Sequence, residues 1–140
     1  MSVTIDIQTM LYRITAQTFD QNFIVKPEDS LDDGYLHVVR VKSTLGTERA
    51  AIFRATYEWV DVWIRELRVG ATMFDYGDVQ DDKEDDLRRL CIATRVYLEG
   101  GAHVEQRKRM FRKDLIPLVI IDVDGLEWRL GRNHCVVPYL

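Results

Sequence analysis

The sequence is poor in the residues with which small proteins build cross-links or metal sites. Its 140 residues include 2 cysteines and 3 histidines, and Cys91 and Cys135 are too far apart for a CxxC motif. A disulfide framework or a zinc site needs more of these residues at closer spacing. We therefore expect reduced, buried cysteines, no bound cofactor, and a single domain, residues 1–140, stabilised by one continuous hydrophobic core.

Long apolar runs and short catalytic motifs are also missing. No run approaches the roughly 18 apolar residues of a membrane span, and the N-terminal segment MSVTIDIQTM lacks a basic stretch followed by an apolar one. We therefore expect a cytoplasmic, unprocessed protein with no membrane partner. The absence of Gly-rich phosphate loops and of HExxH, GxSxG and paired CxxC motifs favours a protein that is not an enzyme.

An excess of basic residues is lacking as well. The chain has 19 Lys and Arg residues against 23 Asp and Glu residues, so its formal net charge is -4. Because nucleic-acid-binding proteins normally carry a strong basic excess, we do not expect direct contact with nucleic acid. A basic protein is the favoured kind of partner, and the content of 46% hydrophobic and 30% charged residues is typical of a globular protein.

Residues 115–132 (LIPLVIIDVDGLEWRLGR) predict a β-hairpin around which the rest of the chain is arranged. The pair Asp124-Gly125 favours a two-residue type I′ turn, and such a turn fixes which residues face each other. The resulting register gives one wholly apolar face, which we expect to be buried with Trp128 in the core. Its facing pairs are Val123 with Leu126, Ile121 with Trp128, and Val119 with Leu130.

Two carboxylates face each other on the other side of this hairpin. Asp122 lies opposite Glu127, and carboxylates in this position repel each other unless a cation lies between them. Either Arg107 or Arg109 of a neighbouring strand, or a bound metal ion, would supply that cation. The metal-bound arrangement resembles the PD-(D/E)xK nucleases, although that family has Lys where this chain has Arg129. A metal-dependent nuclease is therefore the alternative function.

Both helical and β-rich patterns occur along the rest of the chain, with the strands in runs that turns join. A helix is expected over residues 6–19 with Thr4 as its N-cap. A hairpin is expected from strands 35–42 and 48–55, which the turn residues STLGT separate. The other expected elements are a strand at 21–26, a loop at 27–34, a helix from about Asp82 to Gly100-Gly101, and a basic strand at 103–113 beside the C-terminal hairpin. The expected buried stripe of that helix consists of Leu87, Leu90, Cys91, Thr94 and Leu98.

Residues 57–69 predict a further helix with Gly70 as its C-terminal cap. Trp59 and Trp63 are one helical turn apart and would then be core residues. The same spacing also fits one longer helix that begins near Thr47, and both interpretations remain open. Runs of strands joined by turns predict an α+β fold, in which helices pack on one face of an antiparallel sheet of β-hairpins.

Acidic residues are concentrated before and within the start of the helix expected from Asp82. Seven of them fall between Asp75 and Asp86, interrupted by one Lys. A solvated loop whose charges complement the helix dipole would explain them. An electrostatic docking surface for a basic partner would also explain them, with two aromatic residues as anchors. The candidate partner-binding residues are Phe74, Asp75, Tyr76, Asp78, Asp81 and Asp82.

Residues 87–132 in the C-terminal half of the chain, LRRLCIATRVYLEGGAHVEQRKRMFRKDLIPLVIIDVDGLEWRLGR, resemble small immunity proteins of bacterial polymorphic toxin systems. The resemblance lies in a helix that ends in YLEGG, a basic strand, and an apolar hairpin that ends in EWRLGR. It implies a cytoplasmic α+β protein that binds and neutralises one cognate toxin, often a nuclease or another nucleotide-directed enzyme. Such proteins act by surface fit, so the resemblance transfers no site residues. A subunit of a phage or another assembly is a third interpretation.

Overall fold

The computed structural model describes residues 6–28, 37–45, 49–56, 58–74, 80–108 and 115–132. In this part of the chain, helices and antiparallel sheets form the α+β fold expected from the sequence. The helices are α1 (Ile7–Thr18) and α2 (Gln80–Leu98). The strands are β1 (Phe23–Glu28), β2 (His37–Ser43), β3 (Ala50–Ala55), β4 (Trp59–Ile64), β5 (Val69–Phe74), β6 (His103–Lys108), β7 (Leu115–Val123) and β8 (Leu126–Leu130).

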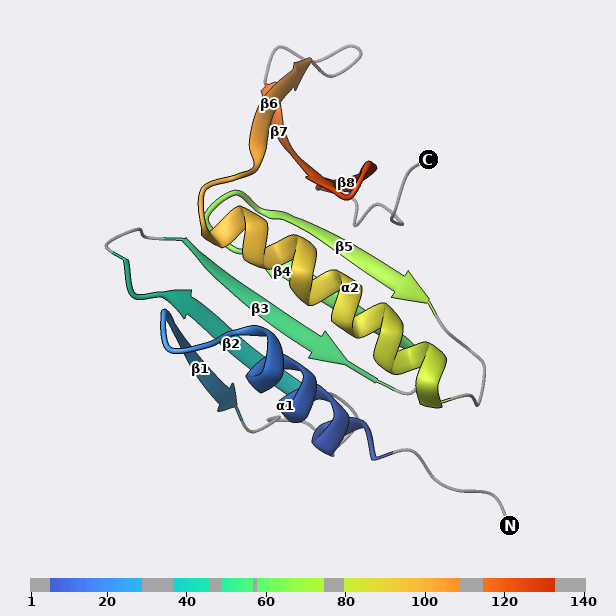
Figure 1. Ribbon diagram of the computed structural model, residues 1–140. Helices are drawn as coiled ribbons and strands as arrows, with labels where there is room; N and C mark the ends of the chain where they lie inside the picture. Colours follow the sequence, from blue (N-terminus) through green and yellow to red (C-terminus); the bar gives the residue numbers. More distant parts are fainter. Residues whose placement is uncertain are drawn as a thin grey trace.

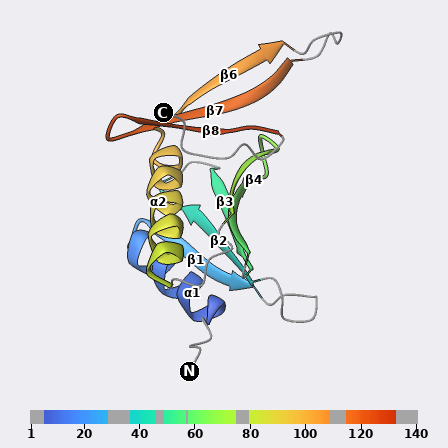
Figure 2. The ribbon, with the colours of Figure 1, turned by 90° about the vertical axis from the view of Figure 1, so that its right-hand side faces the viewer.

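The larger sheet has the strand order β1-β2-β3-β4-β5, and all its neighbouring strands are antiparallel. Both helices lie in front of this sheet in Figure 1, with α1 over β1 and β2 and α2 over β3 and β4. The side view in Figure 2 shows that they cover one face, which we call the inner face. The opposite, outer face is turned away from the helices. The predicted packing of helices on one face of the sheet is confirmed.

The inner face is apolar because the strands place every second residue toward the helices. Val39 and Val41 of β2, Phe53 of β3, and Val62 and Ile64 of β4 are all 0% exposed. Burying a side chain of this size stabilises the folded state by roughly 1.5 to 3 kcal/mol. The main hydrophobic core therefore lies between the inner face and the two helices.

The smaller sheet, of order β6-β7-β8, contains the hairpin predicted from Asp124-Gly125. Its register is confirmed residue by residue. The φ angles of Asp124 and Gly125 are 53° and 84°, and a type I′ turn requires positive values at both positions. Trp128 faces Ile121 and is 2% exposed, so its predicted place in the core is also confirmed.

The helix predicted for residues 57–69 is wrong, because residues 59–64 form β4 and residues 65–68 form the turn that leads into β5. The alternative of one longer helix from near Thr47 is wrong as well, because residues 50–55 form β3. Trp59 and Trp63 are four residues apart, a spacing that puts two side chains on one face of a strand as well as of a helix. Both are half-buried on the outer face and are not core residues. Gly70 does not cap a helix. It pairs with Gly131, with N···O distances of 2.9 and 3.1 Å, and so joins the two sheets.

The other expected strands are confirmed with shifted ends. The strand expected at 21–26 is β1, which continues through Pro27, and an edge strand tolerates proline. The expected loop at 27–34 therefore starts later, and its residues 29–34 lie outside the described part of the chain. The expected hairpin is the antiparallel pair β2 and β3. The basic strand is β6 beside β7, and residues 109–113 of that prediction are not described.

The N-cap of α1 is Asp6, whereas Thr4, the predicted cap, lies outside the described residues. Oδ1 of Asp6 accepts a hydrogen bond from the backbone N–H of Thr9 at 3.0 Å, and Oδ2 accepts one from its hydroxyl group at 2.8 Å. These bonds, the backbone bond first, lower the pKa of Asp6. Asp and Thr are both preferred N-cap residues, so their identities alone did not locate the start of the helix.

Helix α2 begins at Gln80 and its last residue is Leu98, and the predicted pair Gly100-Gly101 terminates it. The N–H of Gly100 donates to the carbonyl oxygen of Tyr97 at 3.0 Å, and that of Gly101 donates to Val96 at 2.8 Å. This pair of bonds is a Schellman motif, and the φ of +88° at Gly100 is the left-handed conformation it requires. The predicted buried stripe is confirmed for all five members, Leu87, Leu90, Cys91, Thr94 and Leu98.

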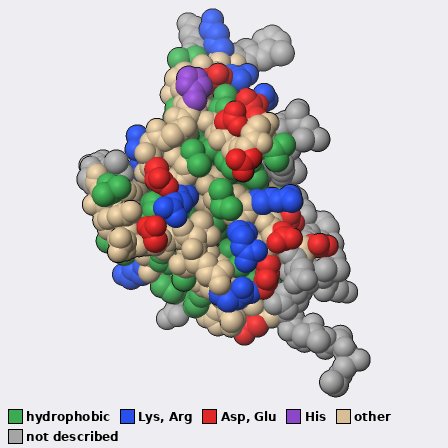
Figure 3. Space-filling model, in the orientation of Figure 1, with side chains coloured by type: hydrophobic (Ala, Val, Ile, Leu, Met, Phe, Trp, Pro, Cys, Tyr) green, Lys and Arg blue, Asp and Glu red, His purple; other side chains and the backbone are tan. Residues whose placement is uncertain are grey.

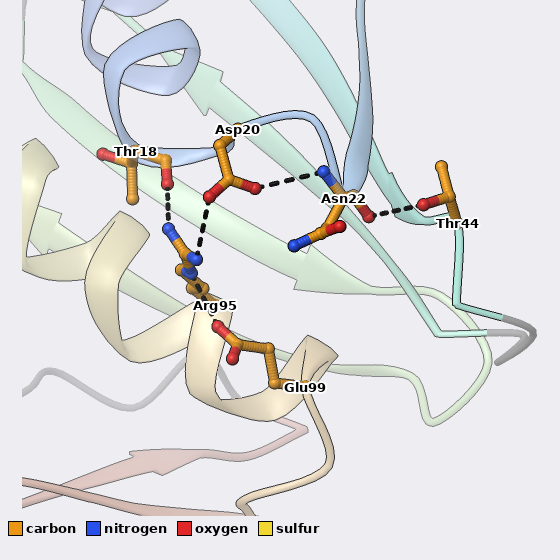
Figure 4. Close-up of polar contacts among 6 residues, drawn as sticks. All are labelled: Thr18, Asp20, Asn22, Thr44, Arg95 and Glu99. Atoms are coloured by element: carbon orange, nitrogen blue, oxygen red, sulfur yellow. Dashed lines mark hydrogen bonds and ion pairs between the residues drawn. The ribbon is translucent and has the colours of Figure 1, made fainter.

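Arg95 joins the last turns of α2 to the end of α1 (Figure 4). Its Nη1 donates to the carbonyl oxygen of Thr18 at 2.7 Å, and its Nη2 lies 3.2 Å from Oδ2 of Asp20. Its Nε donates to Glu99 at 2.6 Å, and its guanidinium group lies 5.4 Å from the ring centroid of Phe23. One side chain therefore holds both helices and the start of β1 together.

The same network continues from Asp20 to the end of β2 (Figure 4). Oδ1 of Asp20 accepts the N–H of Asn22 at 3.1 Å, and the carbonyl oxygen of Asn22 accepts both the N–H and the hydroxyl of Thr44, at 3.0 and 2.9 Å. The Asn22 N–H, and after it the charge of Arg95, lower the pKa of Asp20. The ionised form of Asp20 is therefore the form that the fold stabilises.

We expect Trp128→Ala to lower the free energy of unfolding by roughly 3 to 5 kcal/mol, because it removes a large buried aromatic group. Trp59→Ala is the matched control, and its cost should be clearly smaller because Trp59 is half-buried on the outer face. Urea unfolding followed by circular dichroism measures both. A loss below about 1 kcal/mol for Trp128→Ala would contradict the burial of this hairpin face.

We expect Asp20 to make the stability of the protein depend on acid pH. The pKa of Asp20 is lower in the folded state than in the unfolded chain, where it is about 4. The stability that the ionised carboxylate adds is therefore fully present above about pH 4 and is lost as the pH falls through the folded-state pKa. Urea unfolding between about pH 5 and pH 3 should show a smaller loss for Asp20→Asn than for the wild type. Asp124→Asn, in the hairpin turn, is the control, and identical losses in wild type and Asp20→Asn would disprove the role of the network.

Candidate functional site

The predicted partner-binding residues are divided between two elements and a segment that is not described. Phe74 is the last residue of β5 and pairs with Trp59 in the sheet register. Asp81 and Asp82 lie in the first turn of α2, where Asp82 is exposed. The other three predicted residues, Asp75, Tyr76 and Asp78, lie outside the described part of the chain.

The first turns of α2 carry cations as well as carboxylates. Glu84 forms an ion pair with Arg13 of α1, and Asp85 lies 3.5 Å from Arg88. Figure 3 shows acidic and basic side chains mixed over the helical face of the molecule. Negative charge at a helix N-terminus is stabilised by the helix dipole, so these carboxylates have a structural role in addition to any contact with a partner.

The two carboxylates of the C-terminal hairpin face each other as predicted, but their cation comes from an unexpected place. Asp122 is opposite Glu127, and Nε of Arg129, on the same strand as Glu127, lies 2.7 Å from its Oε2. Asp122 accepts a hydrogen bond from the N–H of Gly125 at 3.2 Å. Arg107 does not reach this pair, because it lies opposite Ile116, near the far end of β7.

Arg107 pairs instead with Glu105 of its own strand at 2.8 Å, and Arg109, the other predicted cation, lies outside the described residues. Across the described ranges, no three His, Cys, Asp or Glu side chains are grouped so that they could hold a metal ion. The arrangement of Asp122 and Glu127 is therefore explained by a turn hydrogen bond and an ion pair with Arg129.

Cys91 is the described cysteine, and its environment does not activate it. It is free and 0% exposed under the sheet, and burial raises the pKa of its thiol. The thiolate is the nucleophilic form of cysteine, so a buried thiol with a raised pKa is unreactive. We therefore treat Cys91 as a packing residue of α2.

Strands β6 and β7 form a ribbon that projects from the rest of the molecule (Figures 1 and 2). In the described part of the chain, β6 pairs with β7 alone and is an edge strand. Val104 of β6 is 40% exposed and Leu115 of β7 is 55% exposed. The sequence predicted both strands, but it contained no sign that they extend beyond the core.

The outer face of the larger sheet is a surface that the sequence analysis missed. Over β1, β2 and β3 it contains a hollow of about 410 Å³ that Lys26, Arg40 and Lys42 line. Arg65, in the turn after β4, also lines it. The sequence contained only a partial signal: Arg40 and Lys42 are two residues apart in β2, which places both on one face of a sheet, but nothing indicated that Lys26 and Arg65 lie beside them.

Comparisons with known proteins leave these surfaces without a precedent. No protein-family model, curated protein or solved structure matches the chain. Within the described residues, no helix is both long enough and apolar enough to cross a membrane.

We expect no calorimetric response when the protein is titrated with magnesium or manganese, because Arg129 already neutralises Glu127. The measurement is isothermal titration calorimetry, with incubation of DNA and RNA as a test for cleavage. Asp122→Asn and Asp124→Asn are matched variants of the same hairpin. Tight metal binding that is lost in Asp122→Asn alone, together with cleavage, would favour the metal-dependent nuclease.

Proposed function

We propose that the protein is not an enzyme, and that it binds a cognate protein toxin and neutralises it by covering part of its surface. The observation that carries this proposal is the projecting ribbon of β6 and β7, which presents apolar side chains to solvent and, among the described strands, an edge with no pairing partner. The choice of a toxin as partner rests on the resemblance of residues 87–132 to immunity proteins. A nuclease or another nucleotide-directed enzyme is the proposed class of toxin.

The ribbon is suited to binding because one apolar face of β7 is buried in the core at one end of the strand and exposed to solvent at the other. Val119 and Ile121 are 0% exposed where β7 packs on the body of the protein. On the same face of the strand, two residues apart each time, Pro117 is half-buried and Leu115 is 55% exposed. Val104, opposite Val119, extends this apolar surface onto β6. A partner that covers this surface removes apolar area from water, which favours association.

The edge of β6 offers a second type of contact. Edge strands have free backbone N–H and C=O groups that can pair with an added strand, and several protein domains bind extended segments in this way. The charged side chains of Glu105, Arg107 and Lys108 lie along this edge. Charges on an edge discourage indiscriminate pairing, so a partner strand must match them. This requirement provides specificity for one partner.

The acidic residues at the start of α2 have a separate proposed role, in the approach of the partner. Helix α2 has 19 residues and runs between the acidic end and the ribbon end of the molecule (Figure 1). At about 1.5 Å per residue its ends are roughly 28 Å apart. Charges at this distance from the ribbon contribute little to the bound contact, but they attract a basic partner during the encounter.

The proposal predicts that two groups of substitutions change different rate constants. Once the partner has been identified by pull-down from the native host and mass spectrometry, Leu115→Ser in the ribbon should speed dissociation at least tenfold. Charge reversal of Asp75, Asp78, Asp81 and Asp82 to Lys should slow association and weaken its salt dependence. Tyr76→Ala, which removes the proposed aromatic anchor, should mainly speed dissociation. Surface plasmon resonance at two salt concentrations measures the association and dissociation rate constants.

Ile92→Ser is the matched control, because Ile92 is an exposed aliphatic residue of α2, 41% exposed, outside both surfaces. The neutralising function itself is tested by adding the protein to its purified partner at equal molarity, which should abolish the partner's toxic activity. Unchanged kinetics in the ribbon and acidic variants would refute these interaction surfaces. Binding without loss of toxic activity would instead favour the assembly-subunit hypothesis.

A further inference from the structure

The hollow in the outer face exists because a small residue lies among large ones. Ala50 faces outward at the start of β3, opposite Lys42 of β2. Lys42 in turn lies opposite Ile24 of β1, and Ile52, two residues along β3 from Ala50, also lines the hollow. Arg65 closes its other side from the turn after β4. The methyl group of Ala50 leaves a depression with an aliphatic floor and a basic rim.

The cations on this rim are available to a ligand. Lys26, Lys42 and Arg65 are exposed, and they form no ion pair with any residue that the structure describes. Arg40, also on the rim, is paired with Glu28 at 2.6 Å. The net charge of the protein is -4, yet three cations around this hollow have no ion-pair partner among the described residues, so the local charge is positive.

One carboxylate, that of Glu66, also lines the hollow, and the fold already uses it. Its Oε1 accepts a hydrogen bond from the backbone N–H of Ala50 at 3.2 Å and one from the hydroxyl of Tyr97 at 3.0 Å. These bonds hold Glu66 at the edge of the sheet, next to the end of α2. The rim therefore keeps an excess of positive charge with Glu66 included.

We infer that this hollow binds a small phosphorylated organic molecule, with the phosphate groups at the basic rim and the apolar body on the aliphatic floor. A volume of about 410 Å³ is within the range of small-molecule sites, which are commonly apolar with a few charged groups that orient the ligand. Phosphate groups carry more than one negative charge and many acceptor atoms, and Arg and Lys are the usual residues that bind them.

This site lies on the larger sheet, away from the ribbon of β6 and β7, so the inference does not depend on the proposed binding of a toxin. The experiment titrates the full chain with ADP and, separately, with 1-naphthyl phosphate, in low salt, by calorimetry. Adenosine provides a body without phosphate, and pyrophosphate provides phosphate without a body. We expect saturable 1:1 binding of at least one phosphorylated organic probe, at least tenfold tighter than adenosine or pyrophosphate, and weaker at higher salt.

Two variants locate the binding. Ala50→Leu fills the hollow, and Lys42→Ala removes a rim cation; each should weaken binding of the probe at least tenfold. Both side chains point away from the core, and urea unfolding checks that the variants fold. Arg89→Ala removes an exposed cation of α2, on the helical side of the molecule, and is the control that should bind as the wild type does. Binding of ADP alone would identify a nucleotide as the ligand class, and binding of both probes a broader class of phosphorylated compounds.

The inference is overturned if neither organic probe binds, or if binding is unchanged in both Ala50→Leu and Lys42→Ala. It is also overturned if pyrophosphate binds as tightly as the organic probes, because the aliphatic floor would then contribute nothing. Loss of toxin binding in a ribbon variant that still binds the phosphorylated probe would show that the two sites are independent.

Discussion

The register of the five-stranded sheet is the constraint on which the other features of the molecule depend. Successive residues of a strand point to opposite faces, so a shift by one residue would exchange the two faces completely. In β2 such a shift would carry Arg40 and Lys42 under the helices and expose Val39 and Val41. Burying an unpaired charge costs several kcal/mol, so the register is strongly fixed. The same constraint that builds the core gathers the cations on the outer face.

The smaller sheet extends this core and then leaves it. Its hairpin buries Trp128 and Leu130 against the body, and the bridge between Gly70 and Gly131 joins it to the edge of the larger sheet. From Val119 toward Leu115, the ribbon leaves the body of the protein, and the exposed fraction of the side chain rises from 0% at Val119 to 55% at Leu115 (Figure 2). One strand, β7, therefore serves the core at one end and presents a surface to solvent at the other.

The elements that the sequence predicted well are those with a local and unambiguous cause. The pair Asp124-Gly125 specifies a turn and through it a register, and Gly100-Gly101 specifies the end of a helix. The spacing of Trp59 and Trp63 has no unique meaning, because four residues bring side chains to the same face of either a helix or a strand. The valines around Asp61 favour a strand in such a case, since β-branched residues fit a sheet better than a helix.

The outer-face hollow could not be predicted for a different reason. Lys26, Lys42 and Arg65 are far apart in the sequence, and each looks like an ordinary surface residue in its own segment. Only the order of β1, β2, β3 and β4 brings them around Ala50, and strand order depends on tertiary packing. The acidic residues near the start of α2 are adjacent in the sequence and therefore suggested a purely acidic surface. In the structure, the described ones lie among cations such as Arg13 and Arg88.

The bond from Arg95 to the carbonyl oxygen of Thr18 has a consequence for the time course of folding, because it spans 77 residues. The strands β1 to β5 pair with their neighbours in sequence, so their hairpins can form while the chain is still being synthesised. Helix α2 comes later, and until it is available the inner face over β3 and β4 has no cover. During that interval the nascent chain exposes an apolar sheet, a state prone to aggregation. Docking of α2 and closure of the Arg95 network end this vulnerable period.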